Sequence, residues 1–247
     1  NIHMIFTRHD KNGATTFDRL KKTAELMSEY SIKYNILTVV NDKVASNILE
    51  IYSYYKENGW NYQQYIACLD PLDEKRGEKK YALRQEQYGK FLIQLFNLWY
   101  EDWEKNEQPY IRQFDNYIAI LLGYQPESCE QRGTCGIQNV VEADGSVFPC
   151  DFYMTDDYYI GNYNYDQTET IDEKRREIGF VARSTNISDE CRECKFIKIC
   201  RNGCQRCRDK DDITGKYRNY FCESYKMFFD ECLDKMEYIA SYIAKKN

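Results

Sequence analysis

Histidine and long apolar runs are what this sequence lacks most clearly. Only two of its 247 residues are histidine, His3 and His9, and both lie far from the cysteines. Any metal site rich in ligands must therefore draw on thiols. No apolar run approaches the roughly 18 residues that a membrane-spanning helix needs, so no membrane partner is expected.

An export signal is also absent from the start of the chain. It begins at Asn1 with no initiator Met and no basic segment leading into an apolar run, which is not the pattern of a signal peptide. We expect a piece of a longer protein. The eleven cysteines are an odd number, which favours a reducing, cytoplasmic compartment and metal ligation over disulfides. The net charge of −6 and pI near 5.2 argue against a nucleic-acid partner.

Cysteine is the residue that is present in unusual number. Five thiols lie within seventeen residues, spaced C-x2-C-x5-C-x3-C-x2-C from Cys191 to Cys207. A C-x2-C pair lets two thiolates reach one metal from a tight turn. Four more cysteines flank this segment, with Gly145 between the second and third: Cys129, Cys135, Cys150 and Cys222.

Iron and zinc are both compatible with these thiols. A 4Fe-4S cluster takes four thiolates, so two clusters would use eight of the eleven cysteines. A four-cysteine zinc site is the alternative. The scarcity of histidine and the C-x5-C-x3-C continuation, unlike the paired motifs of a zinc ribbon, favour iron. The cations between Arg192 and Lys210 are expected to stabilise an anionic cluster.

The chain divides in composition near residue 125. Before this point, helical periodicity from Thr16 and apolar strands predict two or three β/α units, the C-terminal part of a partial (β/α) barrel in an α/β fold. After it we expect an irregular α+β domain with a hairpin at 140–148. The predicted domains are thus 1–125 and 126–247. The predicted strands and later helices are 34–40, 45–58, 62–69, 83–105, 114–122 and 221–245.

The combined cysteine pattern, C-x9-G-x4-C, then C-x2-C-x5-C-x3-C, then C-x17-C, resembles the SPASM module of radical S-adenosylmethionine (SAM) enzymes. Other phrases resemble the anaerobic sulfatase-maturating enzymes of that group along essentially the whole chain. They are the segments Tyr34–Val40, Cys68–Leu72, Trp99–Asp102, Val141–Tyr153, Cys204–Asp209 and Asn219–Lys226.

The resemblance implies oxidation of a sulfatase Cys or Ser to Cα-formylglycine. In that chemistry a reduced cluster cleaves SAM, the resulting radical takes a hydrogen atom from the target Cβ, a base removes a proton and an electron leaves through two auxiliary 4Fe-4S clusters. Reduced flavodoxin or ferredoxin would be the electron partner. By the resemblance, one auxiliary cluster would be held by Cys129, Cys135, Cys150 and Cys204. The other would be held by Cys191, Cys194, Cys200 and Cys222.

Three further residues are candidates for functional positions, two of them by the resemblance. Asp151, directly after Cys150, matches the proposed general base, with a loop cap as the alternative. Leu69, at the predicted end of a strand, would line the SAM adenine site, or else pack in the core. Arg8 would contact the SAM carboxylate, or else lie on the surface. Of the unassigned cysteines, Cys232 is predicted to be plain core, and Cys207 a non-ligand.

The family's radical-generating C-x3-C-x2-C loop has no counterpart before the predicted barrel segment. The spacing recurs at Cys200, Cys204 and Cys207, but too late in the chain to serve. The chain is therefore expected to be part of a maturase, with its third cluster and SAM in the full-length parent, and to be inactive alone. The alternatives are another SPASM peptide maturase that makes thioethers or cross-links, and a standalone electron-transfer or zinc module.

Overall fold

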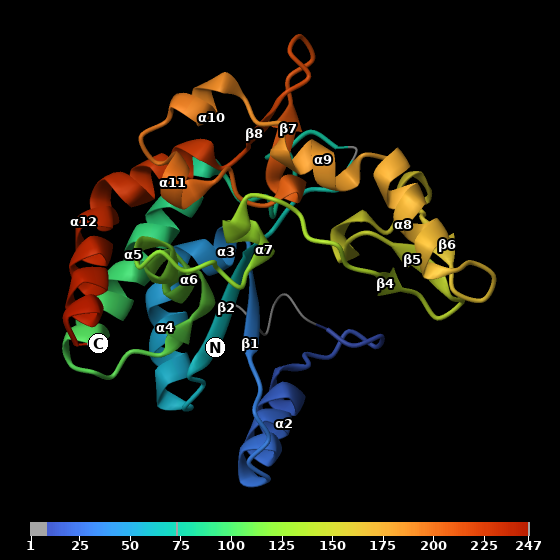
Figure 1. Ribbon diagram of the computed structural model, residues 1–247. Helices are drawn as coiled ribbons and strands as arrows, with labels where there is room; N and C mark the ends of the chain where they lie inside the picture. The colour runs from blue at the N-terminus through green and yellow to red at the C-terminus, as the bar shows by residue number, and fades with distance from the viewer. Residues whose placement is uncertain (1–8, 73, 247) are drawn as a thin grey trace. The chain divides into compact units, whose positions relative to one another are not determined.

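A computed structural model describes residues 9–72 and 74–246, and its contacts divide the chain into two compact units (Figure 1). Unit 1 combines the described residues up to Leu122 with those from Glu223 onwards, and unit 2 is Gly123–Cys222. The boundary at Leu122 lies beside the one predicted near residue 125. The described residues from Glu223 onwards are grouped with unit 1 and not with unit 2. The domain ranges 1–125 and 126–247 stay predictions.

Unit 1 contains a parallel three-stranded sheet in the order β1-β2-β3, made of β1 (Ile36–Val40), β2 (Tyr62–Ala67) and β3 (Tyr110–Ile111). Helices α3 (Asp42–Ser46) and α4 (Ile48–Glu57) connect β1 to β2, so the predicted βαβ unit is confirmed. The first of these helices starts earlier than predicted because the Asn41 side chain caps it, accepting a hydrogen bond from the Val44 N–H at 2.9 Å. Unit 1 is therefore a mixed α/β unit. That it forms the C-terminal part of a partial (β/α) barrel stays a prediction.

Strand β1 is buried on one face only, although a largely apolar run such as Tyr34–Val40 is typical of a parallel strand buried on both faces. Thr38 and Val40 are buried, whereas Leu37 and Val39 are 57% and 50% exposed. Successive side chains of a strand point to opposite faces, so the described helices cover only one face of β1. The apolar run alone could not reveal this, because it reads the same whether one face or both are covered.

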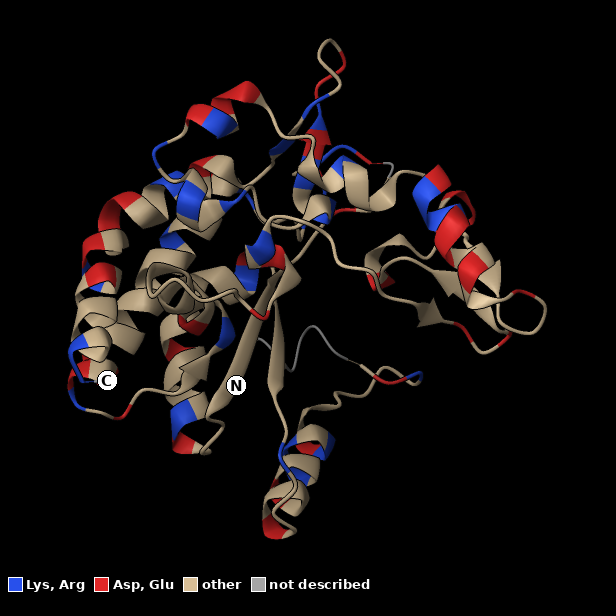
Figure 2. Cartoon of the chain, in the orientation of Figure 1, with Lys and Arg blue, Asp and Glu red and all other residues tan. Residues whose placement is uncertain are grey.

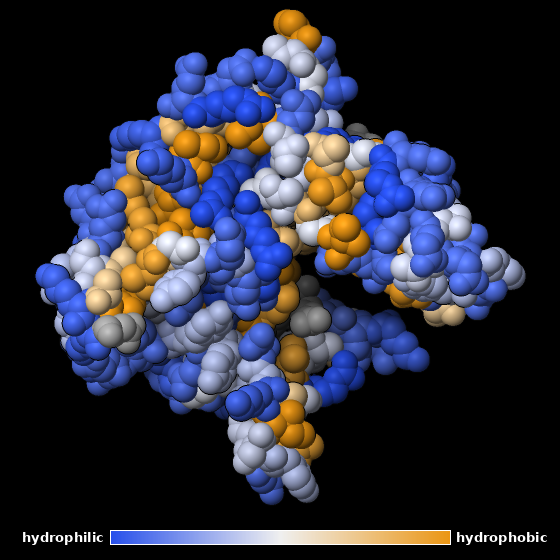
Figure 3. All heavy atoms as spheres, viewed as in Figure 1, coloured by the Kyte–Doolittle hydropathy of each residue, from blue (hydrophilic) through white to orange (hydrophobic). Residues whose placement is uncertain are grey.

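An aromatic core joins three helices of unit 1: α5 (Gln85–Glu104), α6 (Arg112–Leu121) and α12 (Cys222–Lys246). The rings of Phe96, Phe114 and Phe228 have centroids 5.1 to 6.0 Å apart. The apolar stripe on α5, which recurs at helical spacing in the sequence, is therefore core. So is Cys232, whose side chain on α12 is fully buried. Helix α2 (Phe17–Glu29) instead shows apolar atoms at its surface (Figure 3), including Leu26.

Unit 2 is built on two small antiparallel sheets. The predicted hairpin is confirmed as β4 (Val140–Val141) and β5 (Ser146–Phe148), and β6 (Gly161–Asn162) extends it. Gly145 in its turn has φ +86°, and a Cβ there would lie 2.4 Å from the Asn164 amide nitrogen, so the turn requires glycine. The second sheet, β7 (Arg208–Lys210) with β8 (Tyr217–Asn219), was not predicted.

Short helices fill the remainder of unit 2. Helix α8 carries both signs of charge along its surface (Figure 2) and buries Ile171 against Val147 and Ile160. Within the described residues, no helix is both long and apolar enough to cross a membrane. The short helices are α7 (Cys129–Arg132), α8 (Thr168–Glu177), α9 (Phe180–Thr185), α10 (Asp189–Glu193), α11 (Ile197–Cys200), η1 (Asp151–Tyr153), η2 (Asp156–Tyr158) and η3 (Gln205–Cys207).

Candidate iron-sulfur site

Eight thiols of unit 2 fall into two groups by their mutual electrostatic interactions. The Cys204 thiol interacts with those of Cys135 and Cys150, and Cys135 also interacts with Cys129. The first thiol group is therefore Cys129, Cys135, Cys150 and Cys204. The Cys200 thiol interacts with three others, which defines the second thiol group as Cys191, Cys194, Cys200 and Cys222. These are the sets that the resemblance implied, although their role as ligands stays a prediction.

The first thiol group is assembled from four separate segments. Cys129 begins α7, and Cys135 lies in the loop that follows it. The Cys135 N–H donates to the Ser184 hydroxyl at 2.9 Å. Cys150 follows β5, and Cys204 precedes η3. The α7 loop and the segment before Cys204 touch at Gly133, where φ is +72° and a Cβ would lie 2.4 Å from the Arg201 carbonyl oxygen.

A left-handed turn separates Cys200 from Cys204. Arg201, Asn202 and Gly203 have φ of +50°, +65° and +57°, a region that L side chains enter at a cost. The Asn202 side chain compensates, because its carbonyl accepts from the Asn219 N–H at 2.9 Å and its amide donates to the Tyr217 carbonyl at 3.2 Å. The turn sends two thiols only four positions apart into different groups.

Three helices place the second thiol group. Cys191 lies in α10, whose N-terminus is capped by Ser188 accepting from the Cys191 N–H at 3.2 Å. Cys194 directly follows α10 as its C-cap, and Cys200 is the last residue of α11. Cys222 begins α12, as predicted for a thiol at the start of the final helix.

Burial raises the pKa of three of these thiols in the metal-free chain, that of Cys135 to about 11 and those of Cys150 and Cys200 to about 12. A hydrogen bond with Cys207 instead lowers the pKa of Cys204. A metal must therefore displace a proton to bind the sulfur of Cys135, Cys150 or Cys200.

Within residues 9–72 and 74–246, no group of three His, Cys, Asp or Glu side chains is placed to hold one metal ion. The thiolates of a 4Fe-4S cluster bind different irons, so they do not converge on a single point. Next to Cys204, both amide atoms of Gln205 are buried without a hydrogen-bond partner in the described structure. A buried amide is normally paired, and the sulfurs of a cluster are acceptors that its N–H could meet.

The other predicted site residues are placed less closely together. The Cys150 thiol donates to the Asp151 carboxylate at 3.3 Å, and Asp151 is exposed at the start of η1. Leu69, two residues beyond β2, is half-buried in unit 1. Arg8 lies outside the described residues. Nothing in the structure tests the predicted roles of these three residues.

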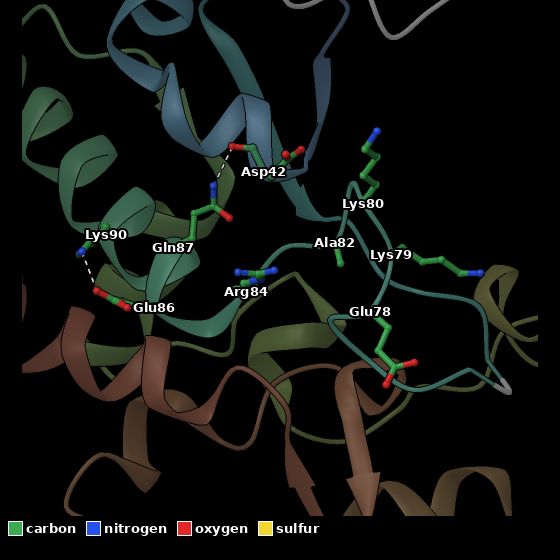
Figure 4. Close-up of a pocket in the computed structure, with 9 residues that line it drawn as sticks. All are labelled: Asp42, Glu78, Lys79, Lys80, Ala82, Arg84, Glu86, Gln87 and Lys90. Atoms are coloured by element: carbon green, nitrogen blue, oxygen red, sulfur yellow. Dashed lines mark hydrogen bonds and ion pairs between the residues drawn. The ribbon is translucent and has the colours of Figure 1, made fainter.

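Unit 1 also has a charged pocket of about 690 Å³ that sequence reasoning missed. Figure 4 shows it beside the end of β1, where Gln87 donates to the Asp42 carbonyl at 2.8 Å and Lys90 pairs with Glu86 at 2.6 Å. None of the predicted site residues that the structure describes lines it. The lining residues are Asp42, Glu78, Lys79, Lys80, Ala82, Arg84, Glu86, Gln87 and Lys90.

Comparison with known proteins bears on the thiol groups. Residues 129–195 match the SPASM family, described as an iron-sulfur cluster-binding domain. The cysteine-type anaerobic sulfatase-maturating enzyme of Clostridium perfringens strain 13 is 39% identical over 242 residues, 98% of this chain and 65% of that protein. This chain is a homologue of the anaerobic sulfatase-maturating enzymes. A serine-type enzyme of Bacteroides thetaiotaomicron is 25% identical over 94% of this chain and 59% of that protein.

Solved structures of these maturases have the same fold. A structure of native anSMEcpe with bound AdoMet and a Cp18Cys peptide superposes with a TM-score of 0.89 over 95% of this chain and 65% of that chain, at 39% identity. That structure thus contains both AdoMet and a peptide. The present chain spans about 65% of the length of the first of these relatives.

Proposed function

We propose that this chain forms the auxiliary-cluster and substrate-side portion of a radical SAM enzyme that oxidises an active-site Cys or Ser of a sulfatase to Cα-formylglycine. The homology and the two thiol groups support this assignment. The chain spans 65% of the length of the Clostridium perfringens relative. The complete reaction is therefore proposed for a polypeptide that also includes the part of the barrel that would bind SAM and the third cluster.

The division of labour follows from the residues. The first and second thiol groups would each hold one 4Fe-4S cluster, and four thiolates per cluster leave no iron open for SAM. When bound, the clusters would supply a route for one electron. Oxidation of Ser removes two hydrogens from the substrate, the equivalent of a hydrogen atom, a proton and that electron. Asp151 is the group proposed to take the proton.

The place of Asp151 directly after the proposed ligand Cys150 is the observation that carries this proposal furthest. Its side chain is exposed, so a substrate can reach it. A base at that position would stand where the proton and the electron leave the same carbon.

Iron and sulfide content after anaerobic reconstitution tests the cluster half of the proposal. We expect about eight irons per chain and broad visible absorbance. Stoichiometric zinc without a visible band would instead favour the zinc module. The catalytic half is tested in the full-length polypeptide with a sulfatase peptide, SAM and reduced flavodoxin or ferredoxin.

Mass spectrometry then separates the candidate reactions. Formylglycine formation removes two hydrogens from a Ser peptide, or replaces the thiol of a Cys peptide by a carbonyl. A thioether or cross-link made by another type of SPASM maturase would retain the sulfur and join residues. Asp151→Asn is expected to retain iron and lose conversion, whereas an unchanged rate would reject Asp151 as the base. A cytoplasmic location fits the reduced thiols.

A further inference from the structure

Arg208 is a buried cation among the cysteines that the reaction scheme leaves without a role. It begins β7, and only 6% of it is exposed. An arginine keeps its charge even when buried, and a buried charge is costly unless its surroundings compensate it. Its neighbours therefore show what the charge is for.

The hydrogen bonds of Arg208 tie together the loops that carry the first thiol group. Its Nη2 donates to the Gly133 carbonyl at 3.1 Å, in the loop between Cys129 and Cys135, and to the Gly203 carbonyl at 2.6 Å, in the turn before Cys204. Nε donates to the Asn202 carbonyl at 3.0 Å, and Nη1 donates to the Ser184 carbonyl. Carbonyl oxygens satisfy the N–H groups and leave the positive charge intact.

Thiols face that charge from both groups. The electrostatic partners of Arg208 begin with Cys135 and Cys204 of the first thiol group, and they extend to Cys207 and to Cys191 of the second. A cluster with four thiolates carries net negative charge, and each added electron increases it. Reduction potentials of iron-sulfur clusters respond to nearby charge. A fixed cation here favours the reduced state of both clusters, and that of the first more.

We propose that the guanidinium charge of Arg208 raises the reduction potentials of both auxiliary clusters. The effect is stronger for the cluster of the first thiol group. This inference rests on the cluster binding proposed above. By this inference, the chain itself would set how readily the auxiliary clusters accept an electron. The inference also predicts that the same side chain fixes the distance between the Gly133 loop and the Gly203 turn.

Reduction potentials measured by redox titration with electron paramagnetic resonance test the inference on the reconstituted chain. Arg208→Gln removes the charge. At the wild-type midpoint we expect at least a tenfold shift of the first cluster towards its oxidised form, which is about 59 mV for one electron. A smaller shift in the same direction is expected for the second cluster. Arg208→Lys, which keeps a cation, should stay nearer the wild-type potentials while losing part of its iron.

Arg175→Gln is the matched control. Arg175 is also buried in unit 2, at 3% exposure, but its hydrogen-bond partners are Asp172, Asn139 and the Gln138 carbonyl, none of them a cysteine. Its removal should leave both potentials unchanged. Potentials in Arg208→Gln equal to those of the control would overturn the inference, and so would failure of both Arg208 variants to retain iron, which would show a purely structural clamp. Failure of the wild-type chain to bind iron would refute the proposed function instead.

Discussion

Gly133→Ala is the substitution for which the structure gives the clearest magnitude. The new Cβ would lie 2.4 Å from the carbonyl oxygen of Arg201 and 2.7 Å from its Cβ, so backbone must move. A left-handed φ of +72° adds about 1 kcal/mol of strain, and overpacking against a rigid neighbour costs about 1–3 kcal/mol. We therefore expect the loop from Cys129 to Cys135 to lose about 2–4 kcal/mol of protection.

Hydrogen–deuterium exchange with mass spectrometry measures this locally, in the metal-free chain. Tryptophan fluorescence should not change, because Trp60, Trp99 and Trp103 all lie in unit 1. Gly179→Ala is the matched control, since φ there is +64° but a Cβ would meet nothing within 4 Å. Equal loss of protection in the two variants would refute the close approach at Gly133 and leave only backbone strain. Iron content should fall in Gly133→Ala and not in the control.

Three further predictions concern single side chains. Tyr52→Phe removes a buried hydrogen bond of 2.7 Å to the Asp102 carboxylate, which Lys56 also contacts at 2.7 Å; we expect a loss of about 1–2 kcal/mol, read from tryptophan fluorescence in urea, and no change would contradict the contact. Burial raises the pKa of the Cys232 thiol from 9.0 to about 12. Between these pH values the folded chain binds more protons than the unfolded chain, so the free energy of unfolding should fall as the pH rises. Cys232→Ala should make this fall with pH less steep. Cys207→Ala should leave the iron content at about eight per chain, whereas a loss of four irons would make Cys207 a ligand.

The sequence predicted those elements whose apolar periodicity is strong. The stripe on α5 and the inward face of α12 became core, because ring after ring recurs at helical spacing. Helix α8 escaped prediction because its ten residues bury only Ile171 and Arg175, which leaves little period to detect. The β7-β8 hairpin escaped because its strands are three residues each and largely polar.

The candidate site shows the same division between pattern and context. Cysteine spacing revealed which residues could bind metal, since thiols at C-x2-C spacing are rare outside such sites. It did not reveal Arg208 or Gly133, whose importance comes from partners far along the chain: Arg208 reaches Gly133 across 75 positions. A buried arginine reads in sequence like any member of a basic stretch. Burial distinguishes Arg208, and also Arg206, from exposed cations such as Lys198 and Lys210.

The crossed order of the thiols makes the two groups depend on one another. Cys204 joins the first group although Cys191, Cys194 and Cys200, which precede it, belong to the second. The left-handed turn between Cys200 and Cys204 is therefore shared, and so are the contacts that stabilise it. Asn202 accepts from the Cys191 thiol at 3.7 Å and its carbonyl accepts from Arg208 at 3.0 Å. Binding at one group fixes one end of this turn, and so lowers the conformational entropy that binding at the other must still overcome.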